Sequence, residues 1–315
     1  IFNRFQPFFS SHILLYHATY KEIPNNIKKN LHNVDPETLY KQIKWLKKYF
    51  DIVSLEDLFD NQSGKVGKLA ITFDDAYNSV FTEALPILEN LKVPSTIYVN
   101  AVTLDQKPLW RDKIRYLINN NLIKDFLNIN PKYFDEKKIT INNFYYQTKN
   151  GQCNSKKLDQ MLDYYLKKNN KSIDEIKFGI SDKKNIKKHP LLFYGNHTYN
   201  HYVLSSLTKE EQEFEIRENH QYMKKLNINY SRIFSIPFGQ AGDLNDETIQ
   251  LLIKYGYKGF LYSDNKINMK PLNQKIQDRS MTLLSGERYI VKSTYNAFHK
   301  HLFKMGVKSL ISKYI

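Results

Sequence analysis

The segment Leu69-Ala70-Ile71-Thr72-Phe73-Asp74-Asp75 has the pattern of a buried strand that ends in two carboxylates. A helical pattern follows through Phe81, Leu85 and Leu88, and a second apolar run occupies residues 95–99. Two buried strands separated by a helix are typical of a parallel β-α-β unit. In β/α folds the chemistry lies where such strands end, so the two aspartates are candidates for a functional site.

The same alternation extends along the chain. Further strand-like runs lie at residues 12–17, 52–55, 191–194, 233–236, 259–262 and 280–283. Seven or eight parallel strands favour a distorted (β/α) barrel, with an open doubly wound sheet as the alternative. We therefore predict a single barrel domain over residues 1–315. It carries a helical insertion at about 104–188, and a C-terminal helix at about 289–315 that packs on the barrel.

A second chemical cluster, His197-Thr198-Tyr199-Asn200-His201, follows the strand-like run at residues 191–194. One carboxylate and two imidazoles can hold a divalent metal ion and leave a coordination position for water. A neighbouring carboxylate is then available as a base, as metal-assisted hydrolysis of an amide or ester requires. Local hydrogen bonding by the histidines and helix capping by the aspartates are the alternatives. The position of both clusters at strand ends favours the metal site.

Four segments resemble motifs of the polysaccharide deacetylase (NodB-homology) family of carbohydrate esterases. They are AITFDDAY (70–77), GNHTYNHYVLSSLT (195–208), FSIPFG (234–239) and LLYHAT (14–19). The resemblance implies that Asp75, His197 and His201 bind the metal and that Asp74 is the general base. It also implies that the Phe238 N–H stabilises the oxyanion.

The sequence departs from the family pattern in three places. Ala76 stands where the family usually has Gly, and Ser235 stands where it has an Arg that orients the catalytic Asp. Arg279 is a candidate replacement, with an ordinary surface arginine as the alternative. The histidine that serves the family as general acid is missing around residues 280–283. His17 ends the first predicted strand on the same face, so we assign it the acid role, with a structural histidine as the alternative.

These observations predict a metal-dependent hydrolase that removes N-acetyl groups from amino sugars of a polysaccharide or glycan precursor. Zinc is the default ion for one carboxylate and two imidazoles, with cobalt or nickel as alternatives. Two other functions remain open: a non-catalytic glycan-binding relative, and a metal hydrolase of non-sugar amides or esters. Neither the sugar, its linkage nor the oligomeric state is specified by the motifs.

Composition narrows the classes of partner. The 315 residues are 41% hydrophobic and carry a net charge of +15, which suits anionic partners. No nucleic-acid motif accompanies this charge, so we expect no nucleic-acid partner.

No apolar run is long enough for a transmembrane helix, and a membrane-surface role for the last helix is the minority interpretation. The single cysteine, Cys153, rules out an internal disulfide. The start at Ile1 lacks a Met and a signal peptide, as in a trimmed chain, and leaves the compartment open.

Overall fold

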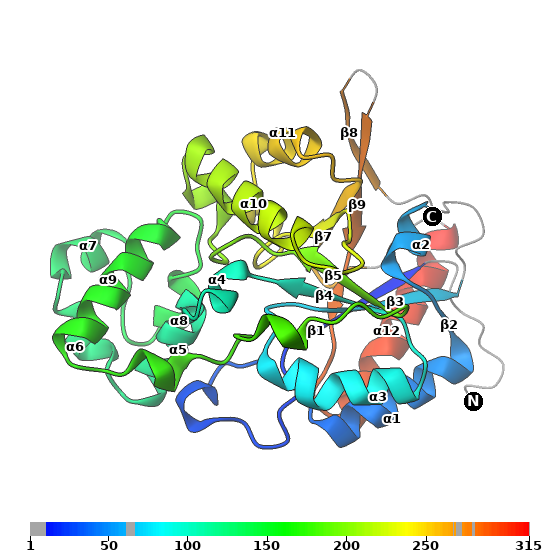
Figure 1. The fold of residues 1–315 in the computed structure, drawn as a ribbon, viewed down its shortest axis with the longest axis horizontal. Helices are drawn as coiled ribbons and strands as arrows, with labels where there is room; N and C mark the ends of the chain where they lie inside the picture. Colours follow the sequence, from blue (N-terminus) through cyan, green and yellow to red (C-terminus); the bar gives the residue numbers. More distant parts are fainter. Residues whose placement is uncertain (1–10, 61–66, 267, 269–272, 279–280, 315) are drawn as a thin grey trace.

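Parallel strands form the centre of the fold in the computed structural model, which describes residues 11–60, 67–266, 268, 273–278 and 281–314 (Figure 1). Four strands of the first sheet lie side by side in parallel: β1 (His12–Tyr16), β3 (Lys68–Phe73), β4 (Ser95–Val99) and β5 (Leu192–Asn196). The short β2 (Asp51–Ile52) pairs with β3. Almost every residue of β1, β3 and β4 is buried, as expected for parallel strands that are covered on both faces.

The second sheet contains the later strands of the chain. β6 (Ile233–Ser235), β7 (Gly259–Tyr262) and β9 (Met281–Glu287) pair in parallel. β8 (Asn273–Asp278) lies at the edge of this sheet and pairs with β9 in the antiparallel direction.

Two junctions join the sheets into a barrel. β9 pairs with β7 in the second sheet, and β10 (Tyr289–Ile290), which follows β9 after one residue, pairs with β1 in the first sheet. One continuous segment therefore belongs to both sheets. At the other junction, a single parallel bridge between Tyr194 and Tyr230 connects β5 to the approach to β6. The predicted distorted β/α barrel is therefore confirmed. Its distortion lies at the second junction, where one bridge replaces a strand ladder.

Helices surround the strands (Figure 1). They are α1 (Pro36–Tyr49), η3 (Val80–Ala84), α3 (Leu85–Asn90), α10 (Lys209–Lys224), α11 (Asp246–Lys254) and α12 (Tyr295–Tyr314), with short turns η2 (Asn25–Ile27), η6 (Leu204–Ser206) and η7 (Ala241–Asp243). α1 begins as its sequence predicts: the Asp35 side chain accepts a hydrogen bond from the Thr38 N–H, and Pro36 is the first helical residue.

The strand predicted at residues 52–55 is wrong after Ile52, because Leu55 begins helix α2 (Leu55–Asp60). Apolar side chains of α2 pack against side chains of the barrel strands, and the ion pair of Asp60 with Lys258 places the end of α2 beside the residue that precedes β7. This cluster consists of Leu55, Leu58 and Phe59 with Ile13, Ala70, Tyr98, Ile233 and Leu261. The helix therefore closes the end of the barrel opposite to the carboxyl ends of the strands.

The chain between β4 and β5 forms helices joined by loops, in the stretch where the sequence predicts a helical insertion. The helices are α4 (Ala101–Leu104), α5 (Trp110–Asn119), α6 (Ile123–Leu127), α7 (Pro131–Glu136), α8 (Phe144–Gln147), α9 (Ser155–Lys168), η4 (Ile173–Ile176) and η5 (Lys183–Asn185). Trp110, Phe126 and Phe144 are buried in the same apolar cluster, which continues to Phe234 of β6 and thereby attaches the insertion to the barrel.

The C-terminal helix starts later than predicted. Tyr289 and Ile290 form β10 beside β1, so α12 begins at Tyr295 and not at about 289. Its Phe298 ring lies 6.2 Å from the Trp45 ring of α1, which packs the helix on the outside of the barrel. Within the described part of the chain, no helix combines the length and the apolar character needed to cross a bilayer.

Candidate metal centre and active site

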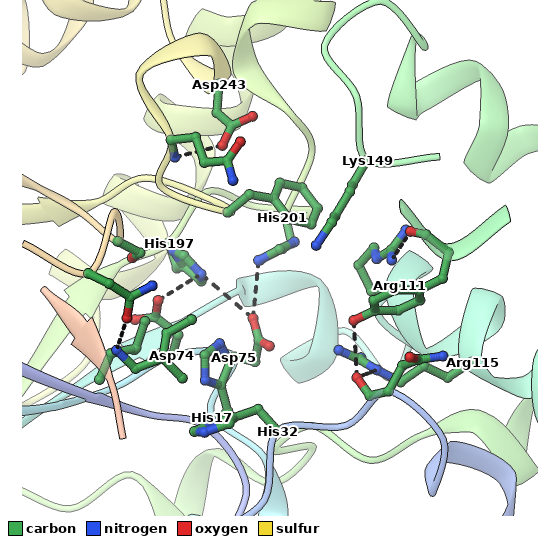
Figure 2. Close-up of a pocket in the computed structure, with 18 residues that line it drawn as sticks. His17, His32, Asp74, Asp75, Arg111, Arg115, Lys149, His197, His201 and Asp243 are labelled. Carbon is green, nitrogen blue, oxygen red and sulfur yellow. Dashed lines mark hydrogen bonds and ion pairs between the residues drawn. The ribbon is translucent and has the colours of Figure 1, made fainter. Parts of the chain in front are cut away.

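One cavity lies at the carboxyl ends of the strands and contains every residue that the sequence assigns to the site (Figure 2). Its volume is about 270 Å³. Asp74 and Asp75 follow β3, His197 follows β5, and His17 follows β1. These residues are far apart in sequence, and the parallel strands bring them to one face.

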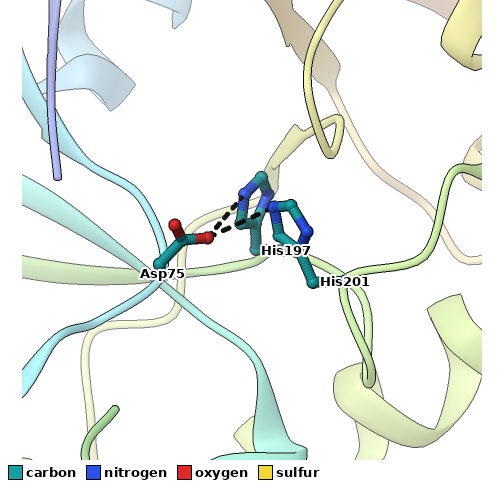
Figure 3. A group of neighbouring side chains, drawn as sticks. All are labelled: Asp75, His197 and His201. Atoms are coloured by element: carbon teal, nitrogen blue, oxygen red, sulfur yellow. Dashed lines mark ion pairs between the residues drawn. The ribbon is translucent and has the colours of Figure 1, made fainter. Parts of the chain in front are cut away.

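Asp75, His197 and His201 form a compact triad (Figure 3). Their potential ligand atoms all lie within 4.8 Å of one another. Asp75 Oδ1 is 3.2 Å from His201 Nε2 and 3.6 Å from His197 Nε2. Although this oxygen is buried, it makes no hydrogen bond to any described residue. Such a shared centre of three converging ligand atoms fits a divalent metal ion.

The electrostatics of the triad agree with this fit. Burial and the adjacent Asp74 raise the pKa of Asp75 to about 8, and a bound cation would reverse that effect. Burial also lowers the pKa of both imidazoles, so their ring nitrogens are neutral and able to bind a metal. The Ser235 carbonyl lies 2.8 Å from His197 Nδ1, which directs Nε2 toward the triad.

Left-handed backbone is concentrated in the site loops. Asp75, Ala76, Thr198, His201 and Phe238 all have φ between 44° and 67°. Few residues other than glycine adopt this conformation, and strain of this kind clusters at functional sites. The φ of 44° at Ala76 also gives a physical reason for the glycine usual at that position in the resembling family.

Asp74 is fixed by a buried arginine that the sequence analysis missed. Arg288 donates to both carboxylate oxygens of Asp74 at 2.8 Å and is fully buried. Arg288 also donates to Ser235 Oγ at 2.9 Å, and that hydroxyl lies 3.2 Å from both Asp74 oxygens. Burial alone would raise the pKa of Asp74, but the Arg288 guanidinium holds it well below its usual range.

Arg288 therefore occupies the role for which Arg279 was the candidate, while Arg279 itself lies outside the described residues. The small serine at position 235 leaves room for the guanidinium of Arg288, which lies between β9 and β10. The signal that could have found it is the strand-end rule: Arg288 directly follows β9, which continues to Glu287 and beyond the predicted end at residue 283.

His17 lines the cavity beside Asp75 (Figure 2). Its Nδ1 atom is buried without a hydrogen bond to a described residue, and its ring is 5.2 Å from the His32 ring. Burial, together with the nearby His32, lowers the pKa of His17 well below 6.5. In the free protein the imidazole is therefore neutral at pH 7.

Phe238 lies at the edge of the triad. Its ring is 4.9 Å from the His201 ring, and its N–H donates to no described residue. The Trp110 indole N–H donates to the His201 carbonyl at 2.8 Å. Trp110 is thus a buried anchor for the loop that contains His197 and His201.

Two further contacts hold the 197–201 loop. The Glu215 carboxylate of α10 accepts hydrogen bonds from the N–H and the side-chain amide of Asn200, both at 2.7 Å. The Asn100 amide, directly after β4, donates to the carbonyls of His197 and Thr198. Fixed loops of this kind keep metal ligands in place before an ion binds.

Comparison with known proteins agrees with the motifs. The family model described as polysaccharide deacetylase matches residues 61–125 and 181–260, and the predicted resemblance is confirmed. No curated protein matches the chain. The solved structure of Streptococcus pyogenes deacetylase PplD in complex with acetate has a TM-score of 0.53 at 17% identity, over 94% of this chain and 97% of PplD.

Two other solved structures share the fold. IcaB from Ammonifex degensii has a TM-score of 0.56 at 14% identity, over 94% of this chain and 97% of IcaB. A de-N-acetylase from Aggregatibacter actinomycetemcomitans has a TM-score of 0.54 at 14% identity, over 92% of this chain and 99% of the other.

Proposed function

Because the chain matches the polysaccharide deacetylase family, we propose that it is a divalent-metal-dependent hydrolase of N-acetyl groups on amino sugars of a polysaccharide or glycan precursor. The observation that carries this proposal is the buried triad of Asp75, His197 and His201 beside the ion pair of Asp74 and Arg288, in one cavity. Two of the similar solved structures are of a deacetylase and a de-N-acetylase, which supports the same reaction class.

The triad would hold the ion. A divalent metal bound there would supply Lewis-acid activation of water and polarisation of the acetyl carbonyl. Neutral imidazoles and a single carboxylate favour zinc, with cobalt or nickel as alternatives.

The chain's own residues would supply the proton transfers. Asp74, held ionised by Arg288, would accept the proton of the attacking water. The bidentate contact fixes the orientation of its carboxylate, so little reorganisation is needed during the reaction. The Phe238 N–H would donate to the acyl oxygen as negative charge develops there.

His17 would protonate the leaving amine. Since its pKa is low in the free protein, His17 would take a proton from solvent in the substrate complex and then pass it to the amine nitrogen as the C–N bond breaks. Negative charge that develops on the acyl oxygen during the reaction would favour the protonated form of the imidazole. His17 lines the same cavity as the triad, which supports this assignment.

The test is acetate release from a panel of N- and O-acetylated glycans, with and without a chelator. We expect release from an N-acetylated glycan, its loss on chelation, and its recovery with zinc, cobalt or nickel. His197→Ala should lose both the bound metal and the activity. Glycan binding without acetate release would favour the non-catalytic relative, and activity confined to non-sugar amides or esters would favour the other alternative.

A further inference from the structure

Three cationic side chains line one side of the cavity that contains the metal triad: Arg111, Arg115 and Lys149 (Figure 2). Arg111 and Arg115 belong to α5 and are 3% and 6% exposed, respectively. Lys149 follows α8 and is half-buried. Burying a charge is costly unless an opposite charge or several hydrogen bonds compensate it, so the partners of each cation are informative.

Arg115 is compensated within the protein. It forms an ion pair of 2.7 Å with Asp112 and donates to the Tyr77 hydroxyl at 2.8 Å. Its Nε–H donates to the Asn30 carbonyl. Arg115 therefore supports the wall of the cavity, and its ion pair with Asp112 offsets part of its positive charge.

Arg111 has only neutral partners. Its guanidinium donates to Thr148 Oγ1 and to the Tyr145 carbonyl, both at 3.0 Å, and lies 4.5 Å from the centre of the Tyr145 ring. Among the described residues, no carboxylate lies within ion-pair distance of Arg111. It is thus held rigidly in the wall, and its charge is available to the cavity.

Lys149 extends into the cavity beside His201 (Figure 2). Its ammonium lies 5.3 Å from the Tyr145 ring centre and 5.2 Å from that of Tyr146, and within the described chain it has no ion pair or hydrogen bond. Asp243 is the acid on this side, and burial raises its pKa to about 6. The other acids of the cavity, Asp74 and Asp75, belong to the catalytic groups.

The pKa of Tyr145, whose ring contacts Arg111 and Lys149, is shifted by the cations of this wall. Burial raises the pKa of Tyr145, but Arg115, Arg111 and Lys149 together lower it to about 8. This side of the cavity therefore favours negative charge. It also adjoins the triad, because the Phe238 ring lies 4.9 Å from the His201 ring and 5.7 Å from the Arg111 guanidinium.

We propose that Arg111 and Lys149 form a subsite for an anionic group, a carboxylate or a phosphate ester, carried by the N-acetylated glycan. The inference rests on the proposed function and narrows its substrate class. The acetamido group would occupy the triad, and the anionic group, on the same sugar or its neighbour, would lie across the Phe238 ring. A planar guanidinium and a mobile ammonium side by side suit an oxyanion with several acceptor atoms.

A structural role explains part of the arrangement. Arg111 ties α5 to α8 through its two hydrogen bonds and would do so without a ligand. Lys149 makes no such tie, yet it extends into the same space. Replacing Lys149 therefore distinguishes a ligand-binding role of this group from a purely structural one.

The direct test is equilibrium binding to the full chain carrying Asp74→Asn, so that turnover does not obscure affinity. The probes are a heparosan tetrasaccharide for the carboxylate and N-acetylglucosamine 6-phosphate for the phosphate. Fully N-acetylated chitotetraose and N-acetylglucosamine are their neutral counterparts. We expect at least one anionic probe to bind roughly tenfold more tightly than its neutral counterpart. The difference should shrink with added salt. Which anionic probe gains affinity identifies the source of the charge.

Lys149→Gln should lower the anionic-to-neutral affinity ratio several-fold, and Arg111→Lys should lower it while keeping the charge, because the planar fork is lost. Lys124→Gln, on the exposed surface of α6 in the same insertion, is the matched control and should leave the ratio unchanged. Denaturation curves check that each variant is folded.

Equal affinity for the anionic and neutral probes would overturn the subsite, as would a preference that survives Lys149→Gln in a folded protein. The proposed reaction fails separately. Absence of acetate release from every glycan by the unsubstituted protein would reject the deacetylase, whereas an intact binding preference would still support the subsite.

Discussion

Two adjacent aspartates have opposite surroundings. The Arg288 guanidinium holds the pKa of Asp74 below its usual range, whereas burial and the adjacent Asp74 raise the pKa of Asp75, which faces two imidazoles, to about 8. The φ of 67° at Asp75 turns the chain between them, so the carboxylates point to different partners. Neighbouring acids whose pKa values are pushed apart in this way are typical of divided catalytic roles.

This division predicts the behaviour of Asp74→Asn. The variant should keep its metal, because the triad is intact, and lose turnover by roughly a hundredfold or more, because the base is gone. Elemental analysis and acetate release measure the two effects. Loss of the metal would mean that the two aspartates have their roles reversed, and full activity would remove Asp74 from the mechanism.

Arg288 allows a prediction about stability. Arg288→Met leaves the Asp74 carboxylate buried without its cation, which should cost roughly 3–5 kcal/mol of unfolding free energy. Urea denaturation measures the loss. Arg217→Met is the matched control, since that arginine is partly exposed and pairs with the neighbouring Glu218. Similar small losses in both variants would show that the buried pair contributes little.

His17 can be tested by its dependence on the leaving group. If it protonates the leaving amine, His17→Ala should slow an N-acetyl substrate sharply and an ester with a good leaving group much less. Metal content should be nearly unchanged. Equal losses on both substrates would indicate an orienting role, and no loss would assign the proton to another donor.

At the residue scale, the sequence predicts those site residues that have another site residue close by in the chain. Asp74 and Asp75 stand together at a strand end, and His197 and His201 are four residues apart. Arg288 lies 214 residues from Asp74 and has no such local pattern. Its contact depends on barrel closure, which no short segment encodes.

At the scale of elements, α10 helps to hold the loop that contains His197 and His201. Its Glu215 side chain holds Asn200, the residue before the ligand His201. Glu215→Leu leaves the Asn200 N–H without its acceptor and should weaken metal affinity by roughly 10–100-fold. Glu210→Leu, exposed on the same helix, is the control. Metal titration with a competing chelator measures both, and equal affinities would show that the loop is held without α10.

Elements with local signals were predicted well, and elements set by tertiary packing were not. Asp35 and Pro36 mark the start of α1 whatever surrounds it. The segment from Leu55 is helical because its apolar side chains close the barrel end, and Tyr289–Ile290 is a strand because β1 lies beside it. Such long-range partners override local preference.

For the whole molecule, alternation of strands and helices predicted the barrel, but the way it closes could not be predicted. Closure depends on one segment that pairs with β7 through β9 and with β1 through β10. The same segment carries Arg288 into the site. Closing the fold and orienting Asp74 are therefore one structural event, which explains why the sequence analysis missed both.

Buried histidines predict how the stability of the whole molecule depends on pH. Burial lowers the pKa of His12 to about 3 and that of His220 to about 4, against an ordinary value of 6.5. Between pH 6.5 and about 4 these two histidines therefore bind more protons in the unfolded chain than in the folded chain, and their contribution lowers the free energy of unfolding as the pH falls. For the fully buried His12 the loss is up to about 2 kcal/mol between pH 6.5 and 5.

Urea denaturation of chelator-treated protein at several pH values measures this slope without competition from a bound metal. His12→Asn removes the titrating group and should flatten the curve, even though it lowers stability at every pH. The same change in unfolding free energy from pH 6.5 to 4.5 in His12→Asn and in the unsubstituted protein would contradict the prediction. It would mean that the folded barrel accepts a proton at His12 without opening.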